Sequence, residues 1–239
     1  MNLPMLSLLA VVRRHHDDPM VAWIAGIVFF GTIAFAIGTI LYRKRLQRKR
    51  TEALPPIAAS LGLEFQPLGS NGLLAKHSCF GLFSRGRHRK ALNVLQGGSD
   101  NRQIAIFDYD YTTGHSEGKM QWHTTVLSFS LADATLPYFF LRKKRINDTV
   151  SRWFRDKDIE IPGYPEFRQR YVLRGKDVAA IRALFTEPVI DFFYRNPSLS
   201  AEGDTQMLVL YRLGKRVKPD AIGEFLATGL EFVALLKLS

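Results

Sequence analysis

The uncharged run from Met20 to Tyr42 constrains this chain more than any other feature. It is 23 residues long, and a helix of that length, rising ~1.5 Å per residue, crosses a hydrocarbon core of about 30 Å. Trp23 and Tyr42 stand near its two ends, where amphipathic rings favour a membrane interface. A core helix of a soluble protein normally shows a polar stripe, and this run has none. It predicts one transmembrane helix over residues 20–42.

Positive charge directly after the run predicts its orientation. The basic residues are Arg43, Lys44, Arg45, Arg48, Lys49 and Arg50. Residues 13–18, before the run, carry two arginines and two aspartates. Because cytoplasmic flanks are rich in Lys and Arg, we expect a short extracytoplasmic tail (1–19) and a cytoplasmic remainder. Two interpretations of the basic run stay open: it only sets topology, or it also contacts anionic lipid headgroups.

The remainder predicts a linker and one cytoplasmic domain. Residues 43–62 are expected to form a basic juxtamembrane linker with a short helix, near whose start Pro55 and Pro56 break the connection to the span. Residues 63–239 are long enough for a substantial core. The net charge is +11, but residues 51–239 carry only +5, from 25 basic and 20 acidic side chains. The single cysteine, Cys79, forms no intrachain disulfide, which suits a reducing cytoplasm.

The order of elements in residues 63–239 predicts an α+β fold with a mainly antiparallel sheet and packed C-terminal helices. Strands are expected at 63–67, 72–76, 79–84, 91–96, 103–111, 121–131, 137–142, 167–173 and 206–211. Helices are expected at 177–185, from 188 to 194, and from 219 onward, with one or two helical turns at 148–154. The last helix carries an apolar stripe interrupted by Gly223 and Gly229, and we expect it to pack on the sheet.

The segments 103–111 and 121–131 predict an antiparallel hairpin, and it holds the candidate chemistry. Asp108 and Asp110 are two residues apart on one strand, so their side chains share a face. A symmetric register would place His123 opposite Asp108, and such a pair has acid–base potential. The alternative, which we favour, is that both carboxylates bond to loop backbone or tyrosine hydroxyls at the open end of the hairpin. Because a slip of one residue would exchange the faces, the register is a hypothesis.

Other motifs give little support for a cofactor or a metal. His77 and Cys79 form an H-x-C step, but a zinc site usually needs about four ligands with paired spacing. Phosphate-loop and dinucleotide-binding patterns are absent from the sequence. A nucleophile elbow is not expected either, because GHSEG (114–118), which fits G-x-S-x-G, lies in the loop of the expected hairpin and not between a strand and a helix. We therefore expect no cofactor and no bound metal.

Two further basic clusters, at residues 85–90 (RGRHRK) and 142–145 (RKKR), have two interpretations. The plainer one is that both are solvated loops. The other is that they face the bilayer beside the juxtamembrane run. Nucleic acid is not the expected partner, because the aromatic residues alternate as a core requires and match no RNA-binding motif.

Several phrases occur in an order that resembles an uncharacterised group of bacterial membrane-anchored proteins. They are FDYDYTTG (107–114), TTVLSF (124–129), LPYFFLR (136–142), PEFRQRYVLRG (165–175) and LVLYR (208–212). The resemblance covers residues 51–239 and implies a bacterial inner-membrane location. Since no activity is assigned to that group, it implies no catalytic residue and no cofactor.

The sequence predicts a single-pass membrane protein whose cytoplasmic domain acts as a binding or regulatory module. The expected partners are the bilayer, anionic lipid headgroups and a membrane protein. A membrane-tethered enzyme using Asp108, Asp110 and His123 is the main alternative, although an enzyme is the less expected class. A third hypothesis is a regulatory subunit whose transmembrane helix contacts a partner helix, for which the Ala34 and Gly38 spacing gives weak support.

Overall fold

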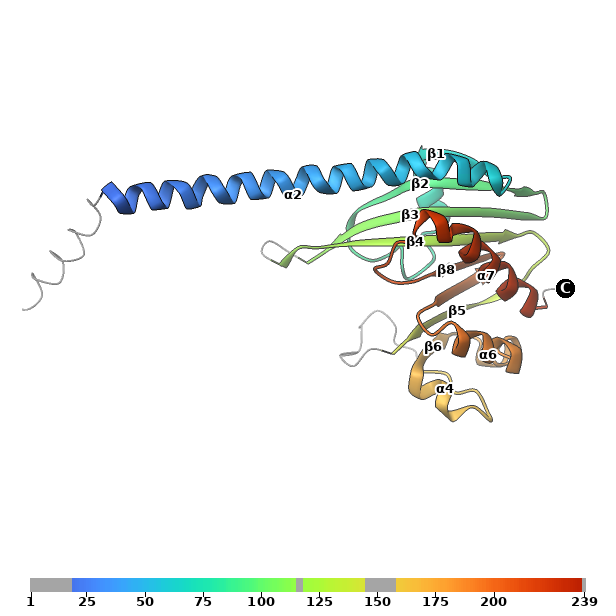
Figure 1. The fold of residues 1–239 in the computed structure, drawn as a ribbon. Helices are drawn as coiled ribbons and strands as arrows, with labels where there is room; N and C mark the ends of the chain where they lie inside the picture. Colours follow the sequence, from blue (N-terminus) through green and yellow to red (C-terminus); the bar gives the residue numbers. More distant parts are fainter. Residues whose placement is uncertain (1–18, 115–117, 145–157, 238–239) are drawn as a thin grey trace, which may run out of the picture. The chain divides into compact units, whose positions relative to one another are not determined.

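The computed structural model describes residues 19–114, 118–144 and 158–237 (Figure 1). The expected helical turns at 148–154 lie outside these residues. Contacts within the chain divide it into a unit that ends at Glu52 and a unit from Ala53 onward. Each unit is described by itself below.

The first unit consists of most of one long helix, α2 (Pro19–Ser60). Its large apolar side chains are open to the surroundings, with Trp23 73% exposed and Phe35 76% exposed. Exposed apolar surface in water is unfavourable by about 25 cal/mol per Å². Among the described residues, α2 is long and apolar enough to cross a membrane by length and composition.

The expected break at the two prolines is wrong, because α2 stays helical through Pro55 and Pro56. A proline removes one backbone donor and disfavours the helix interior. Packing opposes that effect here, since Leu54 and Ala58 are each only 1% exposed and belong to the core of the second unit. The last turns of the helix are therefore part of the folded domain.

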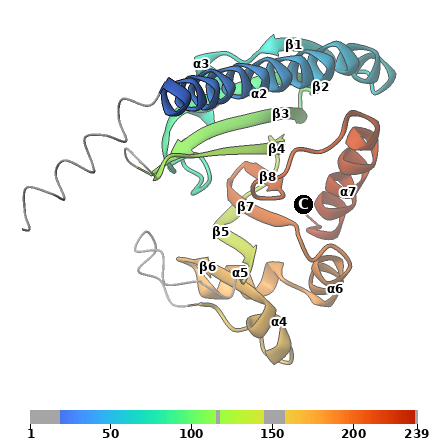
Figure 2. The same ribbon diagram turned by 60° about the vertical axis from the view of Figure 1, so that its left-hand side comes forward.

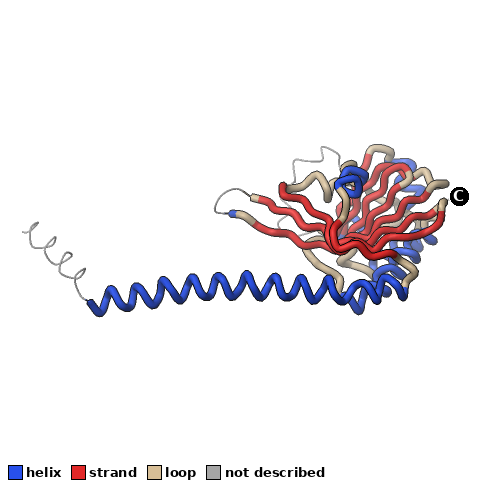
Figure 3. The backbone as a smooth tube through the Cα atoms, turned by 90° about the horizontal axis from the view of Figure 1, so that it is seen from above, coloured by secondary structure: helices blue, strands red, loops and turns tan. Residues whose placement is uncertain are grey.

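The second unit is built on a sheet in which all the strand pairs are antiparallel. The strands are β1 (Glu64–Leu68), β2 (Arg87–Ser99), β3 (Arg102–Thr113), β4 (Met120–Leu131), β5 (Leu136–Lys143), β6 (Tyr171–Gly175), β7 (Ser200–Thr205) and β8 (Met207–Tyr211). Their order is β1-β2-β3-β4-β8-β7-β5-β6. Figure 3 shows them as one twisted layer. The antiparallel sheet and the C-terminal helices confirm the α+β prediction.

Helices and turns bury both faces of the sheet. The short elements are α3 (Asn71–Lys76), α4 (Pro165–Arg170), α5 (Val178–Leu184), α6 (Glu187–Arg195), the 3-10 turn η2 (Pro219–Ala221) and α7 (Ile222–Leu235). On one face, α6 and α7 lie side by side (Figures 1 and 2) and pack with inward residues such as Leu127 and Phe129. On the other face, Phe80 and Phe83 pack with Phe107 and neighbouring residues.

The segment between β1 and β2 is where the expected secondary structure is wrong. Residues 72–76 lie in α3, whose N-terminus is capped by Ser70 Oγ accepting the Leu73 N–H at 3.2 Å. Residues 79–84 form turns, with Phe83 N–H donating to Phe80 O at 3.1 Å. The cap and the turns outweigh the short apolar runs that suggested strands.

Two other differences concern short elements. The expected strand at 167–173 is divided, because α4 occupies residues 165–170 and β6 begins only at Tyr171. The strand β7, of sequence SAEGDT, was not expected. It lacks an alternating apolar pattern because Gly203 and Glu202 lie inside it.

Candidate functional site

The three candidate residues of the hairpin lie on one face, but in a different register from the expected one. His123 is opposite Asp110, and Thr125 is opposite Asp108. The expected pairing of Asp108 with His123 is therefore wrong by two residues. A two-residue shift keeps every side chain on its face, so alternation in the sequence cannot detect it.

Asp110 is the centre of the cluster at the open end of the hairpin. Its Oδ1 lies 2.9 Å from His123 Nδ1. Arg216 Nη2 donates to both carboxylate oxygens at 2.7 Å. The same nitrogen lies 3.3 Å from His123 Nδ1. Arg216 was missed by the sequence analysis because it lies in an irregular segment, 106 residues along the chain from Asp110.

Asp108 is buried deeper, with 1% of its surface exposed. Asn93 Nδ2 donates to it at 2.9 Å, and Thr125 Oγ1 donates at 2.8 Å. Asn93 has a left-handed backbone (φ 51°) within an irregularity of β2, which places its amide beside the carboxylate. Arg216 Nε is 3.9 Å from Asp108 Oδ2. Asp108 is thus held by polar partners inside the fold.

Hydrogen bonds beside this cluster hold residues 212–218 against β4. Thr125 Oγ1 accepts the Val217 N–H at 3.0 Å, and Thr124 Oγ1 accepts the Gly214 N–H at 3.0 Å. Lys215 O accepts the Thr125 N–H at 3.1 Å. The ion pairs of Arg216 with Asp108 and Asp110 hold the same segment against β3. These contacts support the structural interpretation of the two aspartates, with Arg216 and side-chain donors in place of the expected tyrosine hydroxyls.

The chemical capacity of the cluster lies in His123, whose side chain is 41% exposed. Asp110 bonds to Nδ1 and so orients the ring. This leaves Nε2 as the ring nitrogen that could exchange a proton with a bound substrate. The hydroxyl of Thr125, two residues along β4 from His123, donates to Asp108. Within residues 19–114, 118–144 and 158–237, no group of three or more His, Cys, Asp or Glu side chains could hold a metal ion.

His77 and Cys79 have separate environments. His77 is 1% exposed, and its Nε2 lies 2.7 Å from Ser128 Oγ while its Nδ1 lies 2.7 Å from Leu73 O. Burial lowers the pKa of the imidazole to about 4. Cys79 is exposed, and partial burial together with Asp204 raises the pKa of its thiol. His77 is a core residue bonded within the fold.

A second buried polar group lies on the same face of the sheet as His77 and was not expected from the sequence. Glu202 of β7 is fully buried and accepts the N–H groups of Gly81 (2.5 Å) and Leu82 (3.0 Å). Tyr211 donates its hydroxyl to Glu202 at 2.7 Å. Burial raises the pKa of the carboxyl. This carboxylate holds the turns of residues 79–84 on the sheet.

The basic residues after Tyr42 continue along α2 in the first unit. Most are exposed, and Arg48 Nε forms an ion pair with Glu52 at 2.9 Å, one helical turn further on. Such an exposed pair contributes at most about 1 kcal/mol. The charge of the run is therefore largely available to an outside partner.

The two other basic clusters differ in their contacts. Arg87 Nη2 donates to Gly114 O at 3.1 Å, and Arg89 Nη2 donates to Ser84 O at 2.9 Å, so the cluster at 85–90 braces loops at the start of β2. In the cluster at 142–145, Arg142 and Lys143 are the last two residues of β5 and Lys144 follows the strand, while Arg145 lies outside the described residues. The antiparallel registers place residues 85–90 and 142–144 at the end of the sheet where β3 ends and β4 begins.

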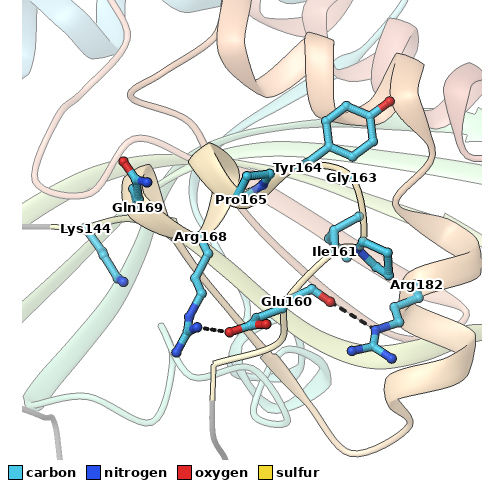
Figure 4. Close-up of a pocket in the computed structure, with 10 residues that line it drawn as sticks. Lys144, Glu160, Ile161, Gly163, Tyr164, Pro165, Arg168, Gln169 and Arg182 are labelled. Carbon is cyan, nitrogen blue, oxygen red and sulfur yellow. Dashed lines mark hydrogen bonds and ion pairs between the residues drawn. The ribbon is translucent and has the colours of Figure 1, made fainter.

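A pocket of about 780 Å³ lies beyond β5, between the loop at residues 160–165 and helices α4 and α5 (Figure 4). Arg168 forms an ion pair with Glu160, and Arg182 Nε donates to Glu160 O at 3.0 Å. Figure 4 shows both contacts converging on Glu160. The third cation of the pocket, Lys144, lies 3.7 Å from Asp158 Oδ2, so all three cations are engaged by the protein itself.

Comparison with known proteins finds a structure with a similar fold but no matching protein family. No protein-family model matches the chain, and no curated protein matches it. The crystal structure of the mycobacterial trehalose monomycolate transport factor A, TtfA, is similar with a TM-score of 0.56 and 17% sequence identity. The match covers 80% of this chain and 96% of that chain. At this identity the likeness shows that the two proteins share a fold.

Proposed function

We propose that this protein is a single-pass membrane protein whose second unit is a cytoplasmic binding or regulatory module at the inner membrane. One observation carries the proposal: an apolar helix with exposed side chains and a following basic run leads without a break into a folded domain. The apolar part requires lipid, and the basic run favours the cytoplasmic side. The domain is thereby confined to the membrane surface.

The partner in this proposal is a membrane protein, with anionic lipid at the basic run. The residues that would contact lipid headgroups are Arg43, Lys44, Arg45, Arg48, Lys49 and Arg50. Each basic side chain near a charged leaflet adds roughly 1 kcal/mol to membrane attraction. TtfA is a transport factor, and its shared fold supports a transport process as the setting for the module.

The test uses the full chain in its native membrane. After alkaline carbonate washing, the protein should remain in the membrane pellet. After extraction in mild detergent, a membrane protein should co-purify with the full chain. It should still co-purify when residues 20–42 are replaced by an unrelated apolar span, and it should be lost when the domain is unfolded by mutation. Recovery in the carbonate supernatant contradicts the anchor. Recovery alone at every salt concentration, without lipid enrichment, contradicts the binding role.

Acid–base catalysis at the hairpin is the second candidate, supported by the contact between His123 and Asp110 and by the exposure of the imidazole. In this alternative, His123 exchanges a proton with substrate, Asp110 orients it and Asp108 positions Arg216. Activity would then fall by about 10²-fold or more in His123→Gln, while the fold is kept. The ion pair between Asp110 and Arg216 favours the structural role, because it occupies both oxygens of the carboxylate.

A further inference from the structure

A small pocket at one end of the sheet gathers positive charge from segments far apart in the sequence. Its volume is about 150 Å³. It is lined by Arg142, Lys143, Lys144, Ser198, Ser200, Arg212, Leu213 and Lys215. Five of these eight residues are basic, two are serines, and none is acidic.

The strand order explains how these residues meet. β7 lies between β5 and β8, and both pairings are antiparallel. Leu141 of β5 is opposite Ala201, and Ser200 is opposite Tyr211 of β8. The end of β5, the start of β7 and the end of β8 therefore lie side by side at one end of the sheet. The pocket that they form belongs to the second unit alone.

Three of the cations have no carboxylate partner within the described residues. Lys143, Lys215 and Arg212 form no ion pair there, whereas Lys144 Nζ lies 3.7 Å from Asp158 Oδ2. The guanidinium of Arg212 lies over the ring of Phe225, 5.7 Å from its centroid. This contact restrains Arg212 while leaving its charge unneutralised. Like charges at close range repel each other, so a bound anion would relieve the repulsion.

The dimensions and the donors specify the anion. A pocket for a drug-sized ligand usually measures about 300–1,000 Å³, so this one admits only a small group. Arginine offers a planar fork of donors, lysine a compact charge, and serine a hydroxyl donor. Together they match the several oxygens of one phosphate.

We propose that this pocket binds a phosphate group, either free or as part of a phospholipid headgroup. The inference deepens the proposed function, because it names a ligand class for the binding module. It does not depend on the juxtamembrane run, which lies in the other unit. The experiments that follow can therefore fail while the membrane anchor stands.

The test compares the full-length chain with a pocket variant and a matched control. The pocket variant is Lys143→Ala with Lys215→Ala, since both lysines are exposed and unpaired among the described residues. The control is Lys90→Ala with Lys176→Ala, which removes the same charge from exposed lysines outside the pocket. Circular dichroism and thermal unfolding in neutral detergent verify that all three proteins are folded.

Calorimetric titration in neutral detergent then uses inorganic phosphate, glycerol 1-phosphate and phosphatidic acid in mixed micelles, with phosphatidylcholine as the uncharged reference. We expect the pocket variant to bind phosphate compounds about tenfold more weakly or worse, and the control to stay within about twofold. Binding of inorganic phosphate and glycerol 1-phosphate identifies a soluble source, and binding of phosphatidic acid alone identifies a lipid source. Either result supports the pocket.

Two outcomes overturn the inference. One is that none of the three phosphate compounds binds at millimolar concentration. The other is that the pocket variant and the control lose affinity equally, because such a loss reports general electrostatic attraction. Dependence on the pocket lysines at constant ionic strength separates a site from a diffuse charge effect.

Discussion

At the scale of single residues, the polar cluster of the hairpin depends on Arg216. It faces two carboxylates, Asp110 at 2.7 Å and the buried Asp108 at 3.9 Å. Its side chain is only 19% exposed. Removing one partner from a buried charge group leaves the other charges without compensation, which is usually more costly than exchanging the whole group for apolar residues.

Substitution of Arg216 should therefore destabilise the domain. We expect Arg216→Met to lower the free energy of unfolding by roughly 2–4 kcal/mol, because it removes the guanidinium that faces both Asp108 and Asp110. Lys218→Met is the control, since Lys218 is exposed and forms no ion pair within the described residues. Urea unfolding of the full chain in neutral detergent measures both. Equal stability of the two variants would show that the ion pairs contribute little.

His77 should make stability depend on pH. Its pKa falls from 6.5 in a free chain to about 4 in the fold, because burial disfavours the charged ring. Between these two values the unfolded chain binds the proton and the folded chain does not, so stability falls as the pH drops from 6.5 to about 4. The loss contributed by His77 is roughly 3 kcal/mol across that window.

The measurement is the difference between the native protein and His77→Gln, by chemical unfolding at several pH values. Glu202 acts in the opposite direction, since its pKa is raised by burial and its protonation favours the fold as the pH falls. Subtracting the two proteins removes that contribution. A difference that stays constant from pH 7 to about pH 4 would contradict the low pKa of His77.

At the scale of elements, the two glycines of α7 have different roles. A side chain on Gly229 would collide with Leu127 and Phe129 of β4, so the helix approaches the sheet closely at this residue. A Cβ on Gly223 would meet Leu61 at 3.8 Å, an ordinary contact. Gly229 interrupts the apolar stripe in the sequence, and in the structure it is where α7 packs tightly on β4.

The pair gives a matched test of that packing. Gly229→Ala should lower the free energy of unfolding by about 1–2 kcal/mol, because overpacking exceeds the gain in helix propensity. Gly223→Ala should leave stability unchanged or raise it by up to about 1 kcal/mol. Thermal and urea unfolding measure both variants. If the two substitutions had the same effect, α7 would not be tightly seated at Gly229.

At the scale of the whole molecule, the proposed topology rests on the length of the apolar helix and on the positive charge that follows it. The helix α2 is 42 residues long, more than an apolar core of about 30 Å requires. The excess extends from the basic run into the folded domain, where its last turns are buried. One continuous helix therefore supplies both the proposed transmembrane segment and, in its last turns, part of the core of the domain.

Cys79 allows a direct test of this topology, because it is the only cysteine and its side chain is exposed. Because the thiolate is the form that reacts and the pKa of this thiol is raised, labelling needs a mildly alkaline buffer of about pH 8. A membrane-impermeant maleimide should label Cys79 only after spheroplasts are permeabilised. In a Cys79→Ser background, Ser7→Cys should be labelled in intact spheroplasts. Labelling of Cys79 before permeabilisation would invert the proposed orientation.

The sequence alone determined the features that repeat locally. A run of 23 uncharged, mostly apolar residues predicts a helix, and the alternation of Phe107, Tyr109 and Tyr111 with polar neighbours predicts a strand. Both predictions are possible because period and length are properties of nearby residues. The apolar helix, the hairpin strands and the α+β class were predictable for this reason. The capping of α3 by Ser70 shows the limit, because one side-chain bond reversed a short apolar pattern.

Only the tertiary structure decided which distant residues meet. The register of the hairpin, the arrival of Arg216 at Asp110 and the burial of Glu202 against Tyr211 leave no local pattern. A shift of two residues preserves every face, so only the complete set of contacts selects one pairing. The phosphate pocket follows the same principle, because its basic residues become neighbours only when β5, β7 and β8 lie side by side.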